Sequence, residues 1–411
     1  MERYESYKDS GVEWIGEIPE GWELLRVKSV AKISNGSDPT TQGDVPVYGS
    51  GGEPFKTCGE YKEGPAVLLG RKGTVSNPHF VTGRYWNVDT AFDVRTNDKM
   101  DIRFFFYSSM LFDYDLFLSS TALPSMTQRD YGMMKIPVPS IETQTWVVSY
   151  LDSKTSEVDG YIADTERSID LLAEYRHAVI SEAVTKGLDP DVPMRDSGIE
   201  WMGSIPEGWG LSKIGRVAYC LNGDRGANYP SGTDMVDDGV AFIPTDALHG
   251  DFVLPEACKF ITRDKYNSLS GVKLQLSDIV YCLRGSVGLC SINCSFSEGT
   301  VASSLMAVRP YACSYKWLYY LLCSEVAQYQ VSLRMNGTCA ANLSAANVCD
   351  FRIPLPDDAV QKDISNYLDA KTAEIDSLVA DKRRLVERLK EYRASLVSEA
   401  VTGKFKVPGV A

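Results

Sequence analysis

The 411-residue sequence has no long hydrophobic run and very little histidine. No stretch approaches eighteen consecutive apolar residues, which argues against a membrane span. The first residues, Met1 to Glu5, lack the apolar core of a secretion signal. There are only three histidines, and the ten cysteines include no C-x-x-C pair, so reduced thiols are favoured over a zinc site or a disulfide framework. We therefore expect a cytoplasmic protein without a membrane or metal partner.

Sequence signatures of catalysis are also missing. There is no G-x-x-x-x-G-K-[ST] phosphate loop, no G-x-S-x-G elbow, no H-E-x-x-H and no G-x-G-x-x-G after a strand. Three scattered histidines leave little room for a His-based triad. Asp357 and Asp358 near Lys362 lie at an expected helix start, where capping explains them better than a nuclease site does. We expect no catalytic residue, no enzymatic activity and a binding role.

The net charge of −13 is unevenly distributed. Residues 24–135 hold 13 Lys and Arg against 12 Asp and Glu, and residues 211–352 hold 12 of each kind. The remaining segments hold 17 basic and 31 acidic residues. Because a neutral block can still present a basic face, the overall charge does not exclude a nucleic-acid partner.

The strongest feature of the sequence is an internal duplication. Residues 8–22 (KDSGVEWIGEIPEGW) return as residues 195–209 with eleven of fifteen positions identical, at an offset of 187. Residues 150–159 (YLDSKTSEVD) and 174–185 also return, both at an offset of 217. The blocks between these repeats barely resemble each other. Two similar frames therefore hold two different inserts.

The second repeat predicts two long helices. Apolar residues recur every seven positions, with polar Thr165 and Lys382 in the middle of each series. This heptad spacing is typical of a coiled-coil seam. The seam residues are Leu151, Val158, Leu172, Val179, Leu368, Ile375, Leu389 and Leu396, and the flanking residues are Tyr161, Tyr175, Leu378, Leu385 and Tyr392. Pairing of the two copies with each other is favoured over two amphipathic helices within one compact core.

The unlike blocks contain short β-prone segments bounded by Gly, Asn or Pro, and a few short apolar helices. Each block is therefore predicted to form a mixed α/β domain of ordinary size. The expected strands include residues 65–70, 92–95, 278–283 and 304–309, and the expected short helices include residues 101–107 and 315–322.

Two loops occupy corresponding places in the blocks. Residues 69–75 (LGRKGTV) and 282–288 (CLRGSVG) each run from a strand into a glycine turn that carries basic and hydroxyl side chains. Such donors suit phosphate oxygens, and Arg can bind guanine through two hydrogen bonds. An ordinary β-turn with solvated side chains explains the loops about equally well. The candidate contacts here are Arg71, Lys72, Thr74, Asn77, Arg284 and Ser286.

A second polar stretch stands near the end of each block, at residues 119–129 and 336–344. Gln or Asn can read adenine and Arg can read guanine, but these residues are also common in turns and helix caps. The candidate contacts are Thr127, Gln128, Arg129, Asn336, Thr338, Asn342 and Ser344.

The ordered set of motifs resembles the specificity subunits of type I restriction-modification systems. The resemblance rests on the duplicated D-S-G-[VI]-E-W-[IM]-G-x-I-P-E-G-W, the Y-L-D-x-K-T-x-E-[VI]-D helices ending in S-E-A-V-T, and the L-G-R-K-G-T-V loop. It covers nearly the whole chain. It implies an α+β fold with a pseudo-two-fold repeat, in which two target recognition domains are separated by two long conserved helices packed as an antiparallel coiled coil.

The resemblance also implies a function. Each recognition domain is expected to read one half of an asymmetric, split site on double-stranded DNA, while the helices set the gap. Two methyltransferase subunits that use S-adenosylmethionine and two restriction subunits that use ATP and Mg are the expected partners, and this chain is expected to hold no cofactor itself. The expected segments are 1–23, recognition domain 1 (24–139), spacer helix 1 (140–187), a linker (188–210), recognition domain 2 (211–356), spacer helix 2 (357–403) and a tail (404–411).

Two other functions remain open on the residues alone. A stand-alone DNA-binding regulator would bind tightly without partners and with a steep salt dependence. A helical scaffold that binds only proteins would show no sequence preference in any assembly.

Overall fold

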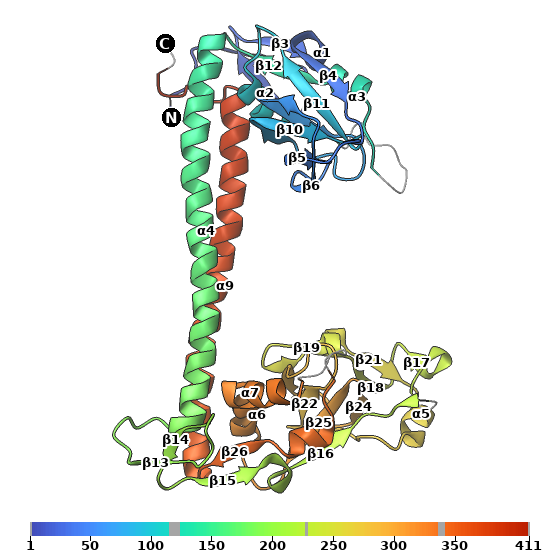
Figure 1. The fold of residues 1–411 in the computed structure, drawn as a ribbon, viewed down its shortest axis with the longest axis vertical. Coiled ribbons are helices and arrows are strands. Elements are labelled where there is room, and N and C mark those ends of the chain that lie inside the picture. The colour runs from blue at the N-terminus through green and yellow to red at the C-terminus, as the bar shows by residue number, and fades with distance from the viewer. Residues whose placement is uncertain (1, 115–123, 227–228, 336–341, 410–411) are drawn as a thin grey trace. The chain divides into compact units, whose positions relative to one another are not determined.

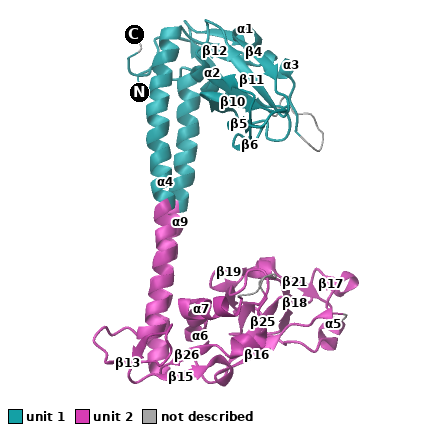
Figure 2. Ribbon diagram, viewed as in Figure 1, with its two compact units in different colours: residues 1–166, 383–411 teal, residues 167–382 magenta. Residues whose placement is uncertain are grey.

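The computed structural model describes residues 2–114, 124–226, 229–335 and 342–409 (Figure 1). The chain divides into two compact units (Figure 2). Unit 1 consists of residues 1–166 and 383–411, and unit 2 consists of residues 167–382. Each unit contains one α/β domain and parts of both long helices.

The α/β domain of unit 1 is built on two four-stranded sheets. The first has the strand order β4-β11-β8-β9, with β4 (Ala31–Asn35), β8 (Ala66–Gly70), β9 (His79–Val81) and β11 (Ala91–Thr96). The second has the order β6-β5-β10-β7, with β5 (Val45–Tyr48), β6 (Pro54–Cys58), β7 (Lys62–Glu63) and β10 (Arg84–Asn87). All of β8 is buried, as its unbroken apolar run predicts.

Short elements complete unit 1. They are β1 (Tyr7–Asp9) paired with β2 (Glu17–Pro19), β3 (Glu23–Arg26) paired with β12 (Lys135–Val138), α1 (Val27–Val30), α2 (Ile102–Ser109) and α3 (Gln128–Met133). Helix α2 begins where the Asp101 carboxylate accepts hydrogen bonds from the backbone N–H groups of Arg103 and Phe104. Its apolar face buries Phe104 and Phe105 in the core.

The α/β domain of unit 2 has a larger main sheet of order β16-β25-β22-β23-β20-β19. Its strands are β16 (Ala218–Asn222), β19 (Leu248–His249), β20 (Phe252–Val253), β22 (Ile279–Cys282), β23 (Cys290–Ile292) and β25 (Leu305–Pro310). A second sheet of order β17-β21-β18-β24 contains β17 (Met235–Val236), β18 (Val240–Ile243), β21 (Lys259–Ile261) and β24 (Gly299–Val301). Both α/β domains are therefore two-sheet structures, although unit 2 has two more strands in its main sheet.

The remaining elements of unit 2 surround these sheets. In the described ranges they include β13 (Met194–Asp196) with β14 (Ser204–Pro206), β15 (Gly210–Lys213) with β26 (Arg352–Leu355), α5 (Arg263–Ser268), α6 (Tyr315–Cys323), α7 (Glu325–Arg334), α8 (Ala345–Cys349) and 3-10 turns at 214–216, 232–234, 245–247 and 255–257. The hydrophobic helix α6 buries Trp317 and Leu318 completely, as its unbroken apolar run predicts.

The two long helices begin and end where the sequence predicts. Helix α4 spans Ile141–Lys186, and helix α9 spans Asp358–Val401. The Ser140 hydroxyl accepts a hydrogen bond from Thr143 N (3.2 Å), and the Asp357 carboxylate accepts one from Val360 N (2.9 Å). Gly187 and Gly403 follow the helices with φ of +80° and +70°, values that favour glycine after a helix end.

The helices pack against each other in antiparallel fashion within each unit. In unit 1, Leu151 near the start of α4 shares a core with Leu396 near the end of α9. In unit 2, Ile180 near the end of α4 shares a core with Leu368 near the start of α9. Since the start of each helix meets the end of the other, the duplicated segments bury equivalent faces.

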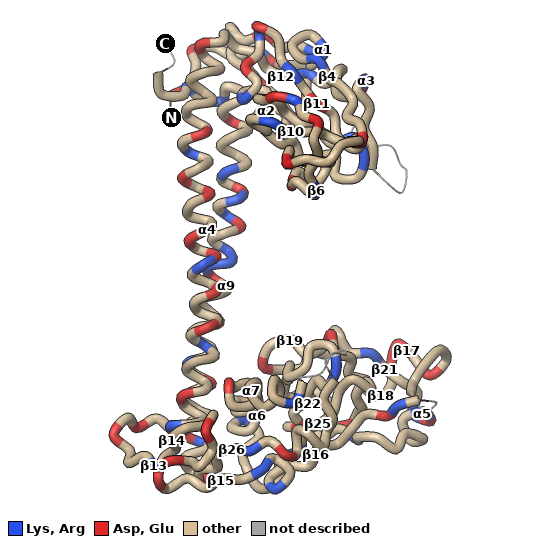
Figure 3. Tube along the Cα trace, in the orientation of Figure 1, with Lys and Arg blue, Asp and Glu red and all other residues tan. Residues whose placement is uncertain are grey.

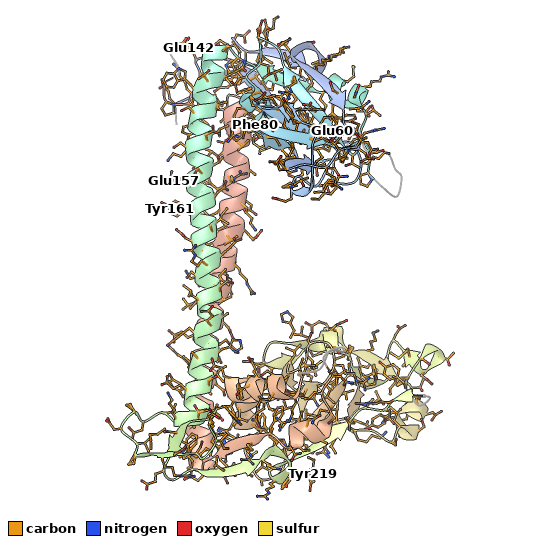
Figure 4. The ribbon with its side chains drawn as sticks, viewed as in Figure 1. Glu60, Phe80, Glu142, Glu157, Tyr161 and Tyr219 are labelled. Carbon is orange, nitrogen blue, oxygen red and sulfur yellow. The ribbon has the colours of Figure 1, made fainter. Side chains whose placement is uncertain are left out.

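Burial along the helices refines the expected seam. Leu151, Val158, Leu368, Ile375 and Leu396 are buried, and Leu172, Val179 and Leu389 are half-buried. The positions four residues further along complete the seam, with buried Thr155, Ala183, Thr372, Val386 and Ala400. The expected flanking residues are mainly exposed instead, at 57% for Tyr161, 48% for Tyr175, 44% for Leu378, 47% for Leu385 and 49% for Tyr392. Figure 4 shows Tyr161 extending away from the helix pair.

Repeated polar contacts attach each α/β domain to a long helix. In unit 1, the Asp152 carboxylate on α4 accepts hydrogen bonds from the Tyr107 hydroxyl (2.5 Å) and from Arg103 Nε (2.9 Å). In unit 2, Asp369 on α9 accepts a hydrogen bond from the Tyr320 hydroxyl (2.8 Å). Asp152 and Asp369 are equivalent, 217 residues apart, in the duplicated Y-L-D motif. The same polar anchor therefore holds each domain at the start of a helix.

The N- and C-terminal segments lie side by side in unit 1. Lys406 N donates a hydrogen bond to Glu2 O at 2.7 Å, and the Tyr7 hydroxyl donates one to Lys404 O at 3.1 Å. Phe405, in the tail, is 4% exposed and packs edge-on against Tyr150. By the two sequence offsets, these two segments correspond to the continuous residues 187–195 of unit 2.

Candidate functional site

The glycine loop of unit 1, residues 71–75, follows β8 directly. Arg71 N donates a hydrogen bond to Thr90 O at 2.7 Å, and Gly73 N donates one to Pro124 O at 2.9 Å. Gly73 has a φ of +82°, which side chains with a Cβ rarely adopt. The loop therefore turns at a glycine, and its backbone is held on both sides.

The glycine loop of unit 2, residues 284–288, has the same construction after β22. Leu283 N donates a hydrogen bond to Ser304 O at 2.8 Å, and Gly285 has a φ of +80°. Thr74 in the first loop and Ser286 in the second are both exposed one residue after the glycine. The two loops thus place a hydroxyl at the same point of the turn.

The second polar stretch of each domain pairs with its glycine loop. In unit 1, Lys72 and Ser125 form an isolated antiparallel β-bridge, and Met126 N donates a hydrogen bond to Arg71 O at 2.9 Å. In unit 2, Arg284 forms the equivalent bridge with Asn342. The two candidate segments of each domain, far apart in sequence, therefore form one surface.

The backbone pairing fixes the register between the two loops. The bridges align Lys72 with Arg284, and the positive φ values align Gly73 with Gly285. Arg71 therefore corresponds to Leu283, which is fully buried, and not to Arg284 as the side-by-side sequence listing of the loops suggests. The sequences of the two loops align Arg71 with Arg284, because sequence alone does not show which residue of each loop forms the β-bridge.

Several candidate contacts have a structural task in this surface. Thr127 caps α3, where its hydroxyl accepts a hydrogen bond from Asp130 N at 3.2 Å. Ser344 caps α8 in the same way by accepting one from Asn347 N at 3.1 Å. The alternative interpretation of these two hydroxyls as helix caps is therefore correct, and both still lie on the exposed side of the loops.

The other candidate contacts are mainly exposed. Gln128 Nε2 donates a hydrogen bond to Asn35 Oδ1 at 3.0 Å. Asn77, Arg129 and Asn342 are exposed. Asn336 and Thr338 lie outside the described residues.

Two residues of the unit 1 surface escaped sequence reasoning. Tyr131 is fully buried beneath the glycine loop, and its hydroxyl donates to Gly70 O (2.7 Å) and lies 3.2 Å from Val75 O. Burial raises the pKa of Tyr131, so its hydroxyl remains a donor. Asp89 lies beside the loop, with Oδ2 4.0 Å from both Arg71 Nη1 and Lys72 Nζ. Neither residue belongs to a repeated motif, so the sequence offered no signal for them.

Basic and acidic residues are interspersed along the chain in both α/β domains (Figure 3). Arg71 and Lys72 are 35% and 46% exposed, and Asp89 is 49% exposed. In unit 2, Arg284 is half-buried, and its buried Nε has no hydrogen-bond partner among the described residues. Each surface therefore offers cationic donors, and the one in unit 1 also offers a carboxylate acceptor.

Among the described residues, no three His, Cys, Asp or Glu side chains are grouped so that they could hold a metal ion. None of the helices in the described ranges combines the length and apolar character that crossing a bilayer requires.

The comparisons with known proteins agree with this organisation. The family model of the type I restriction modification DNA specificity domain matches residues 19–159. The type I restriction enzyme MjaVIII specificity subunit of Methanocaldococcus jannaschii is 23% identical over 420 residues, which cover 95% of this chain and 94% of that protein. The EcoBI specificity subunit of Escherichia coli is 22% identical, covering 94% and 87%. The chain belongs to the type I restriction-modification specificity subunits.

Solved structures share the fold of this specificity subunit. A chain from a structural study of complex assembly and conformational transition in a type I system has a TM-score of 0.74 at 16% identity, with 94% of this chain and 99% of that chain covered. The HsdS subunit from Thermoanaerobacter tengcongensis has a TM-score of 0.51 at 18% identity, with 94% and 98% covered. The expectation of mixed α/β domains with two packed long helices is confirmed.

The family assignment defines the role of the chain. It is the DNA specificity subunit of a type I restriction-modification system, the non-catalytic part of a complex that binds DNA. In that complex the methyltransferase and restriction subunits use S-adenosylmethionine and ATP.

Proposed function

We propose that the subunit reads a split, asymmetric DNA site, with one half read by residues 24–139 and the other by residues 211–356. The observation that carries this proposal is the pairing of each glycine loop with a polar stretch at the same place in both domains. Equivalent backbones with unlike side chains suit two readers of different sequence. Residues 140–187 and 357–403 then act as the spacer, and residues 1–23, 188–210 and 404–411 connect the parts.

The chemistry of the side chains on these two surfaces supports contact with DNA. Lys72 and Arg284 occupy equivalent bridge positions, and Thr74 and Ser286 follow at equivalent turn positions. A cation next to a hydroxyl can bind phosphate oxygens. Polar side chains nearby that differ between the two domains are suited to base edges in the major groove. These include Arg71, Asn77, Gln128, Arg129, Asn342 and, outside the described residues, Asn336 and Thr338.

The buried seam supports a fixed gap between the half-sites. Ion pairs cross the seam at equivalent positions in the two units. Arg393 Nε lies 2.8 Å from Asp159 Oδ1 in unit 1, and Arg176 Nε lies 3.2 Å from Asp376 Oδ1 in unit 2. Each pair fixes one helix against the other, because a slip by one turn would separate the charges.

A repeated surface patch supports two copies of one partner. In unit 1, Tyr150 lies near exposed Tyr392, which contributes after burial to the raised pKa of Tyr150. The equivalent patch in unit 2 contains Tyr367 and Tyr175, 43% and 48% exposed. Beside each patch a lysine pairs with a glutamate at 2.8 Å, Lys154 with Glu157 and Lys371 with Glu374.

Tyrosine is enriched in protein interfaces, whose rims are polar and accessible to solvent. We propose that each patch binds one methyltransferase subunit, and that two restriction subunits with their ATP and Mg join through these. The complex would act on the host chromosome and therefore in the cytoplasm.

Methylation mapping tests the proposal. The chain is co-expressed with the methyltransferase subunit encoded beside it, and modified adenines are located in the host DNA. A split, asymmetric motif with a constant gap is expected. Exchanging residues 24–139 for the equivalent domain of another specificity subunit should change one half of the motif and leave the other half and the gap as they were.

The alternatives predict other results. A stand-alone regulator would bind DNA as tightly without the methyltransferase subunits as with them, and with a steep dependence on salt. A protein-binding scaffold would assemble but give no sequence-dependent modification. Either result would overturn the two-reader proposal.

A further inference from the structure

The two glycine loops differ in side chain where their backbones agree. Arg71 N and Leu283 N donate to the equivalent carbonyls of Thr90 and Ser304, at 2.7 and 2.8 Å. Leu283 is fully buried, whereas the side chain of Arg71 is 35% exposed. Since domain 2 builds the same turn with a leucine, the loop fold does not require an arginine at this position. Arg71 is therefore an addition that only domain 1 has.

Asp89 accompanies this arginine. Its backbone carbonyl accepts a hydrogen bond from Arg71 Nη1 at 3.2 Å, while its Oδ2 lies 4.0 Å from both Arg71 Nη1 and Lys72 Nζ. The bond to the carbonyl orients the guanidinium and leaves its other N–H groups available. In domain 2 the corresponding residue, immediately before Ser304, is Ser303, which has no charge.

The carboxylate decides what this group of side chains can bind. A phosphate oxygen only accepts hydrogen bonds, so a phosphate could use the donors of Arg71 but would leave the acceptor oxygens of Asp89 without a donor. The edge of a G·C base pair is a better match, because guanine N7 and O6 accept hydrogen bonds and cytosine N4 donates them. Arginine supplies the two donors for guanine, and aspartate supplies the acceptor for cytosine.

Resting on the proposed function, we propose that Arg71 and Asp89 together read one G·C base pair in the half-site of domain 1. Lys72, which aligns with Arg284, has the separate task of holding a phosphate. The contacts that both domains share thus position the DNA, and the pair that only domain 1 has selects a base.

Two variants copy the residues that domain 2 uses at these positions, which makes them compatible with the loop. Arg71→Leu and Asp89→Ser are each mapped for methylation in the complex, with Asp98→Ser as control. Asp98 is an exposed aspartate that follows the C-terminal end of β11, whereas Asp89 precedes the N-terminal end of this strand. Each test variant is expected to relax one G·C position in one half of the motif and to leave the other half and the gap intact. The preference for that base pair should fall by about 5- to 150-fold.

A modified duplex tests the contact atom by atom. Replacing the guanine of that position by 7-deazaguanine removes the N7 acceptor. The wild-type complex should lose affinity on this duplex, while the Arg71→Leu complex should bind both duplexes equally. Lys72→Ala should instead weaken binding to all sequences and reduce the salt slope by about 1.

The outcomes separate the two levels of the proposal. If Lys72→Ala and Arg284→Ala weaken binding while Arg71→Leu and Asp89→Ser leave the motif unchanged, the loops contact DNA but this pair does not read it. If the wild-type motif has no G·C pair in the half read by domain 1, the conclusion is again that Arg71 and Asp89 do not read a base pair. If Lys72→Ala and Arg284→Ala also leave binding and motif unchanged, the proposed DNA surface itself is wrong.

Discussion

Arg176 and Arg393 are equivalent residues of the duplicated helices, but their surroundings predict very different contributions to stability. Arg176 Nη2 lies 2.6 Å from Asp251 Oδ1, and these side chains are only 19% and 21% exposed. The same carboxylate oxygen accepts a hydrogen bond from the Tyr319 hydroxyl at 2.7 Å. Arg393 pairs with Asp159, and these side chains are 32% and 52% exposed. Arg176 thus connects the helix seam to the β19–β20 turn of the α/β domain in unit 2.

Removing each arginine gives a matched comparison. Arg176→Ala leaves the Asp251 carboxylate largely buried without its cation, which costs about 3 kcal/mol of unfolding free energy. Arg393→Ala breaks a more solvated pair and should cost about 0–1 kcal/mol. The difference of about 2 kcal/mol corresponds to a roughly 30-fold difference in local unfolding equilibrium. The destabilisation caused by Arg176→Ala should be concentrated in unit 2.

Hydrogen exchange measured by mass spectrometry can resolve this difference by segment. Peptides covering β20, α6 and the end of α4 should exchange faster in Arg176→Ala. In Arg393→Ala, the exchange rates of peptides from unit 1 should hardly change. Arg176→Met retains the apolar stem and removes the charge, so it separates lost packing from the lost ion pair. Equal destabilisation by Arg176→Ala and Arg393→Ala, or full protection in Arg176→Met, would refute the reasoning.

Three further predictions follow from local geometry. Tyr131→Phe removes the hydroxyl beneath the glycine loop and should cost about 1 kcal/mol, seen as faster exchange in residues 70–75 and not in residues 283–288. The pKa of Glu60 is lowered to about 2 by hydrogen bonds from Thr40 and Thr41, so its stabilising effect is present above the ordinary pKa of 4.5 and disappears as the pH falls towards 2. The urea midpoints of wild type and Glu60→Gln should therefore differ at pH 6 and converge in acid, and a constant difference would contradict this. A circular permutant that joins residue 409 to residue 2 by a short linker and opens the chain at residues 188–190 should fold and retain the methylation motif, because Lys406 and Glu2 already hydrogen-bond; loss of folding would show that residues 187–195 are needed intact.

The sequence predicted those features that are repeated or periodic. The two long helices and the capped helix start at Asp357 are local patterns, and all are present. The expected short strands and helices of the α/β domains also appear, with ends that differ by one or two residues. Duplication supplied the strongest constraint, because a repeated motif must have the same task twice.

Features that depend on contacts distant in sequence could not be predicted. The bridge between Lys72 and Ser125 joins segments 53 residues apart, and contacts of this kind in both domains reveal that Arg71 corresponds to Leu283. Asp89 stands in a turn before β11 and has no motif of its own. The flanking tyrosines of the helices followed an apolar stripe, but the seam is completed by Thr, Ala and Val at other positions, so these large side chains remain exposed.

The way in which the glycine loops are held has a consequence for how new specificities could be obtained. Their shape depends on backbone hydrogen bonds, on Gly73 and Gly285, and in unit 1 on buried Tyr131. The side chains at positions 71, 77, 129 and 342, which are proposed to face base edges, take no part in the backbone hydrogen bonds that shape the turns. A library randomised at these four positions, with the glycines and Tyr131 retained, should therefore consist mostly of folded subunits. Selection for altered methylation could then act on recognition alone, without first having to rescue stability.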